Sequence, residues 1–374
     1  MNNIPPVDLT RQHQLISEEV TVAVLEILNS GRYIGGDAVT SFERQFAQYI
    51  GVDECVGCNS GTDALFLALQ ALGIGQGDEV ITTPFTFIAT AEVITRVGAT
   101  PVFVDIDLDT FNLNLQQVRQ AIAPQTKAII PVHLFGQPVD MTELMAIARE
   151  HNLYVIEDCA QATGAEWQGE KIGSIGHIGC FSFFPTKNLG ACGDAGALTT
   201  KDAAIAQKVK ILREHGCQVR YRHDFTGINS RLDAIQAAIL KIKLGYLDDW
   251  NEQRSVAAQN YHRLLQPIKD IKLPSALSGG KSTWNQYTIC VATETTKRDI
   301  LRQKLMDRGV ISMIYYPLPL HLQPVYQDLG YKKGQLPVAE QAAHEVLSLP
   351  MFPGISPEEQ EQVAHTLKDC LEDI

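Results

Sequence analysis

Lys187 is the residue whose surroundings in this sequence most clearly suggest chemistry. It follows an apolar, strand-like run at 178–184 and lies in a segment that contains Gly190, Gly193 and Gly196. Glycines allow backbone conformations and close approaches that other residues do not. A lone lysine in such a loop is usually a solvated surface charge. A lysine held between aromatic residues instead has a lowered pKa, and a neutral amine is what a Schiff-base lysine needs.

Two other features could supply partners for this lysine. Asp158 is at the carboxyl end of a strand predicted at 153–158, and ligands of α/β sheets bind beyond the carboxyl ends of the strands. It is either a solvated loop residue or helix cap, or a carboxylate that holds a cationic ring nitrogen. Residues 60–63 (SGTD) follow a strand-like run and have capping-box spacing. The helix predicted there is either an ordinary capped helix or a site for an anion.

The elements that must position these residues alternate regularly between strands and helices. Between residues 54 and 200, short apolar runs are separated by amphipathic segments. This alternation predicts an α/β fold with three layers, in which helices cover a mostly parallel sheet. The glycines at 73–77 precede a strand instead of following one, which disfavours a dinucleotide-binding loop. A long helix predicted from 232 to about 250 leads from a large domain, residues 1–250, to a smaller α+β domain, residues 251–374.

Composition limits the partners and the cellular compartment. The 374 residues carry a formal charge of −12, which argues against binding to nucleic acid or to an anionic membrane surface. No apolar run reaches membrane-spanning length, and the first residues lack the features of a signal peptide. The eight cysteines are scattered, mostly within apolar runs, as is typical of reduced thiols. We therefore expect a cytoplasmic protein, and no metal site, because the C-x-x-C at 55–58 has no second ligand pair.

One loop is basic although the chain as a whole is acidic. Residues 215–231 contain Arg220, Arg222, His223 and Arg231. Such a loop is either a solvated surface or a phosphate-recognition element, because guanidinium groups offer paired N–H donors to phosphate oxygens.

Five separated motifs occur together in the order and spacing of one known family. They are residues 60–63, 83–87, 157–161, 182–194 and 229–233. The chain closely resembles the DegT/StrS group of nucleotide-sugar aminotransferases over nearly its whole length. These are fold-type I enzymes, similar to aspartate aminotransferase, that depend on pyridoxal 5'-phosphate. The resemblance implies that the large domain binds this cofactor, and that the protein is a homodimer with two shared active sites.

The resemblance also implies a role for individual residues. Lys187 would form the Schiff base with the cofactor and then move the proton between cofactor and substrate carbons. Asp158 would pair with the protonated ring nitrogen, Gln161 would hydrogen-bond the phenolic oxygen, and Phe87 would stack on the ring. The residues implied to hold the phosphate are Gly61, Thr62, Ser182 and, from the neighbouring subunit, Asn229.

The implied reaction is ping-pong transfer of the amino group of L-glutamate to a keto sugar linked to a nucleotide diphosphate. Such reactions serve amino-sugar and cell-surface polysaccharide or glycoside biosynthesis. Many family members have His-Tyr-Pro where this chain has Tyr315-Tyr316-Pro317, which leaves the sugar open. The following Pro-Leu-His-Leu-Gln-Pro run favours a 3-keto sugar over a 4-keto sugar. The residues expected to contact substrate are Arg231, Tyr316 and His321. Two alternatives are a free ketocyclitol acceptor and a regulatory protein of this fold; the intact lysine and aspartate disfavour the second.

Overall fold

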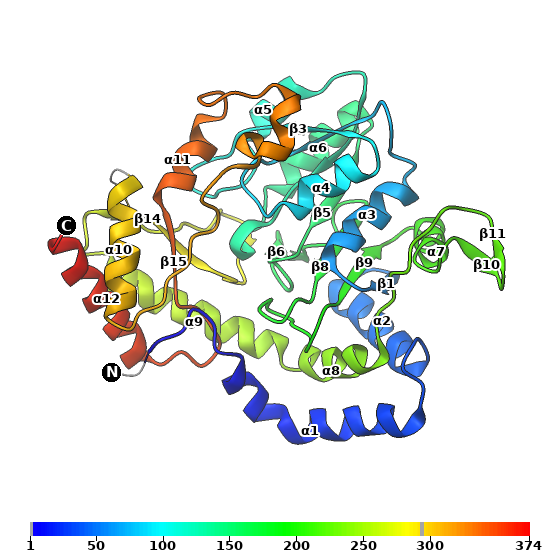
Figure 1. Ribbon diagram of the computed structural model, residues 1–374, viewed down its shortest axis with the longest axis horizontal. Coiled ribbons are helices and arrows are strands. Elements are labelled where there is room, and N and C mark those ends of the chain that lie inside the picture. Colours follow the sequence, from blue (N-terminus) through cyan, green and yellow to red (C-terminus); the bar gives the residue numbers. More distant parts are fainter. Residues whose placement is uncertain (1–2, 292–294) are drawn as a thin grey trace.

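The computed structural model describes residues 3–291 and 295–374, and a seven-stranded sheet lies at its centre (Figure 1). The strand order is β1-β9-β8-β5-β4-β2-β3. The strands are β1 Glu54–Cys58, β2 Glu79–Thr82, β3 Thr100–Phe103, β4 Thr126–Ile130, β5 Tyr154–Asp158, β8 Ile178–Ser182 and β9 Gly196–Thr200. Strand β9 runs antiparallel to both of its neighbours, and the other adjacent pairs are parallel. The carboxyl ends of the parallel strands therefore meet at one edge of the sheet.

Helices cover both faces of this sheet, because its strands are apolar on both sides. Ile129 and Val155 belong to one hydrophobic core, whereas Ile130 and Ile156 belong to the core on the opposite face. The surrounding helices are α2 Asp37–Ile50, α3 Gly61–Ala71, α4 Ala89–Arg96, α5 Leu115–Ala121, α6 Met141–His151, α7 Ala203–Leu212 and α8 Ala234–Leu244. Helix α1 Leu9–Ser30 packs on α8 and α9 instead of on the sheet. The predicted three-layer α/β fold is confirmed.

The C-terminal part of the chain forms a second core around a smaller antiparallel sheet. This sheet has the order β12-β14-β15, with β12 Ile271–Lys272, β14 Tyr287–Val291 and β15 Val346–Leu349. Its helices are α9 Leu247–Leu265, α10 Thr295–Asp307, α11 Pro337–Glu345 and α12 Pro357–Glu372. Tyr261, Tyr287 and Phe352 are completely buried in this core, which Ile4 joins from the other end of the chain.

The helix predicted to run without a break from 232 to about 250 is two helices. Helix α8 ends at Leu244 and α9 begins at Leu247, because Gly245 has a weak helix preference and lies between them. Figure 1 shows α9 leading from α8 toward the C-terminal helices. The expected boundary between residues 250 and 251 falls inside α9.

Two small sheets and three short 3-10 helices complete the structure. In the first sheet, β13 Gly280–Lys281 pairs with β6 Glu166–Trp167, which also pairs with β7 Glu170–Lys171, so this sheet joins the two parts of the chain. The hairpin of β10 Cys217–Val219 and β11 Arg222–His223 projects beyond α7 (Figure 1). The 3-10 helices are η1 Leu134–Gly136, η2 Leu320–Leu322 and η3 Pro324–Leu329. Among the described residues no helix is both long and apolar enough to cross a membrane.

Candidate active site

A cavity of about 630 Å³ lies where the carboxyl ends of the central strands converge. The predicted site residues that line it are Gly61, Thr62, Phe87, Asp158, Gln161, Ser182, Lys187 and Tyr316. They come from the start of α3, the β2–α4 connection, the end of β5 and the loop after it, the end of β8 and the loop after it, and the segment before η2. Side chains separated by up to 255 positions thus share one cavity, which the order of the motifs along the chain did not by itself require.

Lys187 lies in the loop between β8 and β9. Its backbone N–H donates to the carbonyl of Phe184 at 2.8 Å, and the exposed part of its partly buried side chain faces the cavity. Burial lowers the pKa of Lys187 from 10.5 to about 8, and the carboxylate of Asp158 acts in the opposite direction. Because a lower pKa increases the fraction of neutral amine near neutral pH, this lysine is prepared to act as a nucleophile or a base.

Asp158 ends β5 and is 5% exposed. One carboxylate oxygen accepts a hydrogen bond from the hydroxyl of Thr90 at 2.8 Å, and the other accepts from the backbone N–H of Ala160 at 3.1 Å. Burial raises the pKa of Asp158, while these two hydrogen bonds and the charge of Lys187 oppose the change. A cation placed in the cavity beside this carboxylate would favour its charged form further.

Gln161 is fixed by hydrogen bonds at both ends of its amide. Its Oε1 accepts from the backbone N–H of Phe135 at 2.7 Å, and its Nε2 donates to the hydroxyl of Tyr316 at 3.2 Å. Burial raises the pKa of Tyr316, so its hydroxyl stays protonated near neutral pH and can donate onward. The pair therefore presents oriented polar groups to one side of the cavity.

The N-terminus of α3 contacts the ends of two strands closely. A Cβ on Gly61 would lie 2.7 Å from Cβ of Ser182, and a Cβ on Gly196 would lie 2.3 Å from the carbonyl carbon of Ser60. Both positions therefore require glycine. Ser60 caps the helix, and the amides of Gly61 and Thr62 are in its first turn beside the Ser182 hydroxyl. A helix N-terminus with an adjacent hydroxyl can bind a phosphate.

Asn229 and Arg231 do not line this cavity within the described chain. Asn229 is exposed, and its backbone pairs with that of Glu214. Arg231 donates to a carboxylate oxygen of Glu214 at 3.2 Å. The role expected for Asn229 involves a neighbouring subunit, so it stays a prediction.

The predicted contact between His321 and substrate requires correction. This side chain is 1% exposed and is outside the set that lines the cavity. Its Nε2 lies 3.1 Å from Oε1 of Glu340, which also accepts the backbone N–H of Gly334. Buried polar groups are nearly always hydrogen-bonded, and Glu340 of α11 is the partner of this imidazole.

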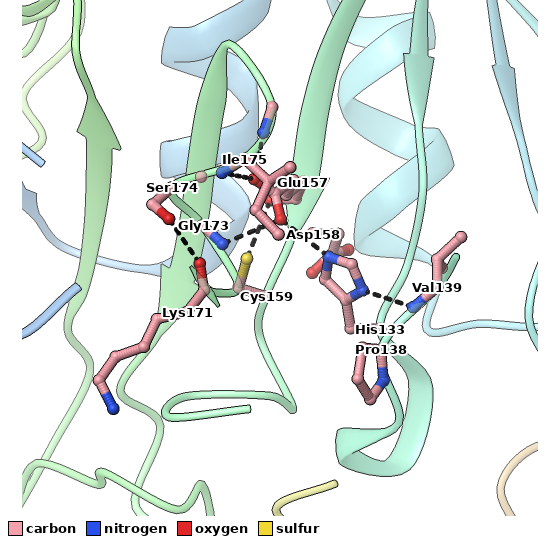
Figure 2. Close-up of polar contacts among 12 residues, drawn as sticks. His133, Pro138, Val139, Glu157, Asp158, Cys159, Lys171, Gly173, Ser174 and Ile175 are labelled. Atoms are coloured by element: carbon pink, nitrogen blue, oxygen red, sulfur yellow. Dashed lines mark hydrogen bonds and ion pairs between the residues drawn. The ribbon is translucent and has the colours of Figure 1, made fainter. Parts of the chain in front are cut away.

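A second polar network surrounds Glu157, the residue before Asp158 (Figure 2). No pattern in the sequence predicted it. The Nδ1 of His133 accepts the backbone N–H of Val139, so Nε2 carries the proton and donates to Glu157 at 3.1 Å. Glu157 accepts further backbone N–H groups, which are those of Gly173, Ile175 and Gly176. His133, Glu157 and Cys159 have ligand atoms within 4.8 Å of one another, but these hydrogen bonds already occupy the carboxylate and the imidazole.

Two cavity residues also lacked a clear signal in the sequence. Thr90 donates to Asp158, and its hydroxyl oxygen lies 3.1 Å from that of Thr86. The only indication in the sequence is that the two threonines are four residues apart, which places them on one side of a helix. Gln286 lines the cavity from the segment that leads into β14, and no pattern in the sequence marks it.

The chain is similar to one known family and to several known proteins. The model of the DegT/DnrJ/EryC1/StrS aminotransferase family matches residues 14–368. A "Pleiotropic regulatory protein" of Geobacillus stearothermophilus is 49% identical, over 98% of both chains. A UDP-N-acetyl-3-dehydro-alpha-D-glucosamine 3-aminotransferase of Acidithiobacillus ferrooxidans is 46% identical, also over 98% of both chains.

Solved structures agree with this result. The crystal structure of DesV from S. venezuelae in complex with a ketimine intermediate is 40% identical and covers 100% of both chains, with a TM-score of 0.96. The structure of NtdA from Bacillus subtilis, with its bound cofactor PMP, is 33% identical with a TM-score of 0.91. It covers 100% of this chain and 86% of that one.

Proposed function

Because the chain belongs to the DegT/DnrJ/EryC1/StrS aminotransferase family, as its motifs predicted, we propose that it aminates a 3-keto sugar linked to a nucleotide diphosphate. The amino donor is L-glutamate and the cofactor is pyridoxal 5'-phosphate. One observation carries the proposal: Lys187, Asp158 and the N-terminus of α3 meet in one cavity. The relative from Acidithiobacillus ferrooxidans, whose name specifies a 3-aminotransferase of a UDP-linked 3-dehydro sugar, supports the position of amination.

The donor set of the cavity fits this cofactor. The α3 N-terminus with Ser182 would hold the phosphate, Asp158 the ring nitrogen, and Gln161 the phenolic oxygen. The neighbouring structure of NtdA with PMP supports the same choice. When bound, pyridoxal phosphate supplies an electron-withdrawing ring that stabilises a developing carbanion.

The protein's own residues would then bind, orient and move protons. The carboxylate of Asp158, held by Thr90 and Ala160, would keep the proton on the ring nitrogen. Lys187, with a pKa of about 8, would accept and return a proton near neutral pH, where a general base is most effective when its pKa is close to the ambient value. Phe87, which is 57% exposed, would cover one face of the ring and exclude water.

A homodimer is part of the proposal. Helix α1 packs Ile16 and Val20 against α8 and α9 but leaves Leu15, Val22 and Leu25 more than half exposed. An apolar surface of this kind is usually covered in an assembly. Asn229 and Arg231 would then contribute to the neighbour's site, where Arg231 would bind the nucleotide diphosphate or a sugar carboxylate. The protein would be a cytoplasmic enzyme, and its formal charge of −12 disfavours nucleic-acid and anionic-membrane partners.

The visible absorption spectrum tests the cofactor and the first half-reaction together. Purified protein with pyridoxal phosphate should absorb at about 400 nm, and L-glutamate should shift the band toward about 330 nm. The Lys187→Ala variant is the matched control and should show neither the protein-bound band nor turnover. A wild-type protein that stays colourless with added pyridoxal phosphate would contradict the proposal.

The acceptor is tested separately with a panel of ketones. It contains nucleotide-linked 3-keto sugars, nucleotide-linked 4-keto sugars and free ketocyclitols, each offered to the protein after reaction with L-glutamate. Return of the band at about 400 nm only with a nucleotide-linked 3-keto sugar supports the proposed substrate. Faster return with either other class would replace it.

A further inference from the structure

The residue after Lys187 joins the active-site loop to the C-terminal part of the chain. Asn188 is 3% exposed, and its amide is fully paired. Its Nδ2 donates to Oδ1 of Asn251 at 2.7 Å and to the carbonyl of Thr283 at 2.9 Å. Its Oδ1 accepts from Nδ2 of Asn285 at 2.7 Å. All three partners belong to α9 or to the segment that leads into β14.

The segment that leads into β14 is also hydrogen-bonded to η1, which contacts Gln161 on another side of the cavity. The backbone N–H of Asn285 donates to the carbonyl of Phe135 at 2.9 Å, and the N–H of Phe135 donates to Gln161 at 2.7 Å. The approach is close, because a Cβ on Gly136 would lie 2.7 Å from Oγ1 of Thr283. Hydrogen bonds therefore form a continuous path from the residue beside Lys187 to the side chain of Gln161.

A buried asparagine could make such bonds only to satisfy its own polar atoms, which would affect stability alone. The partners of Asn188 also affect the geometry of the cavity. The Lys187 loop and η1 are both bonded to residues 283–285, so the separation of the lysine and Gln161 depends on a segment that contains neither. Catalytic groups need this kind of support, because small displacements of reacting groups are costly in rate.

We propose that Asn188 and Asn285 are positioning residues that fix the backbone at Lys187 relative to Gln161 through the segment 283–285. This inference rests on the proposed function, since it concerns the groups that would contact the cofactor. It assigns to Asn285, which is far from the lysine in the sequence, an effect on the reactivity of that lysine.

The test measures the reaction of Lys187 with pyridoxal phosphate in the cofactor-free protein. The product is trapped with borohydride, and the modified peptide is quantified by mass spectrometry, so turnover is not needed. The variants are Asn188→Ala, Asn285→Ala and the double variant. We expect each single change to slow labelling of Lys187 about tenfold or more. The double variant should be little slower than the singles, because both changes break the same link.

The matched control is Asn260→Ala. Asn260 also lies on α9 and makes an amide–amide hydrogen bond, to Gln360 at 2.9 Å, but it has no connection to the cavity loop among the described contacts. It should lower the free energy of unfolding without slowing the labelling. If Asn188→Ala does not fold, Asn285→Ala and Asn285→Asp decide the matter, since Asp keeps the size of the side chain and loses the donor.

The outcomes separate the inference from the function. If wild-type Lys187 is not labelled, the proposed function fails. If wild-type Lys187 is labelled and folded Asn285→Ala and Asn285→Asp react at the same rate, the positioning role is refuted while the function stands. Equal slowing by Asn260→Ala would also refute it, because the effect would then be general destabilisation.

Discussion

Replacing Lys187 by methionine should stabilise the cofactor-free protein at neutral pH while abolishing transamination. Burial lowers the pKa of this lysine from 10.5 to about 8, which corresponds to about 3 kcal/mol at most for holding the charged form in the folded state. Since the side chain is partly exposed to the cavity, water screens part of this cost, and we expect about 1–2 kcal/mol. Methionine has a similar length and no charge, so it removes the cost.

The sign of the pH dependence follows from the direction of the pKa change. Below pH 8 the lysine is charged in the folded and the unfolded chain, so the folded wild type carries the full cost. Between pH 8 and 10.5 the unfolded chain binds more protons than the folded chain, and wild-type stability rises with pH. The advantage of Lys187→Met should therefore be largest below pH 8 and shrink toward pH 10.5.

Urea denaturation at several pH values between 7 and 10.5 measures this difference. All proteins should be cofactor-free, reduced and at one concentration, because thiols and assembly also affect the free energy of unfolding. The control is Lys187→Arg, whose guanidinium stays charged throughout. It should be less stable than the wild type, by an amount that grows above pH 8. A methionine variant that is no more stable at pH 7, or whose advantage does not change with pH, would refute the reasoning.

Three further changes test other parts of the site. Asp158→Asn should lower kcat/KM for transamination about 10²–10³-fold, because it removes a fixed charge from the reaction centre; a variant of unchanged rate in the steady-state assay would contradict that role. Gly61→Ala should weaken binding of pyridoxal phosphate about tenfold in an absorbance titration, since its Cβ would meet Ser182; an unchanged affinity would argue against the phosphate site. Glu157→Ala should lower the free energy of unfolding by about 3 kcal/mol or more, measured with urea, because His133 and three backbone N–H groups lose their acceptor; a loss below about 1 kcal/mol would contradict this, because it would mean that water replaces the carboxylate.

The fold could be predicted because its signal is local and repeated. A strand segment buried on both faces is apolar throughout, as at residues 128–130, and several such segments are followed by a helical pattern. The break between α8 and α9 was missed, because Gly245 lowers helix preference without excluding a helix. Packing of α9 into the second core then decides the direction in which the chain continues.

The candidate site was predictable to the extent that its residues belong to contiguous motifs. Lys187, Asp158 and Gln161 were found in this way, and the structure brings them to one cavity. The structure places His321 outside the cavity, where it pairs with Glu340 of α11, and no pattern in the sequence indicates that pairing. The roles of the cavity residues stay proposals that the experiments above test.

The sequence by itself determined the alternation of strands and helices, the glycines of the close approaches and the types of the reactive side chains. These depend on the chemistry of neighbouring residues along the chain. Only the tertiary structure decided which groups are buried together: His133 with Glu157, and Asn188 with Asn285 from 97 positions away. It also decided that Lys187 has a pKa of about 8. The reason is physical, since desolvation and hydrogen bonding depend on distances in space, which the folded chain sets.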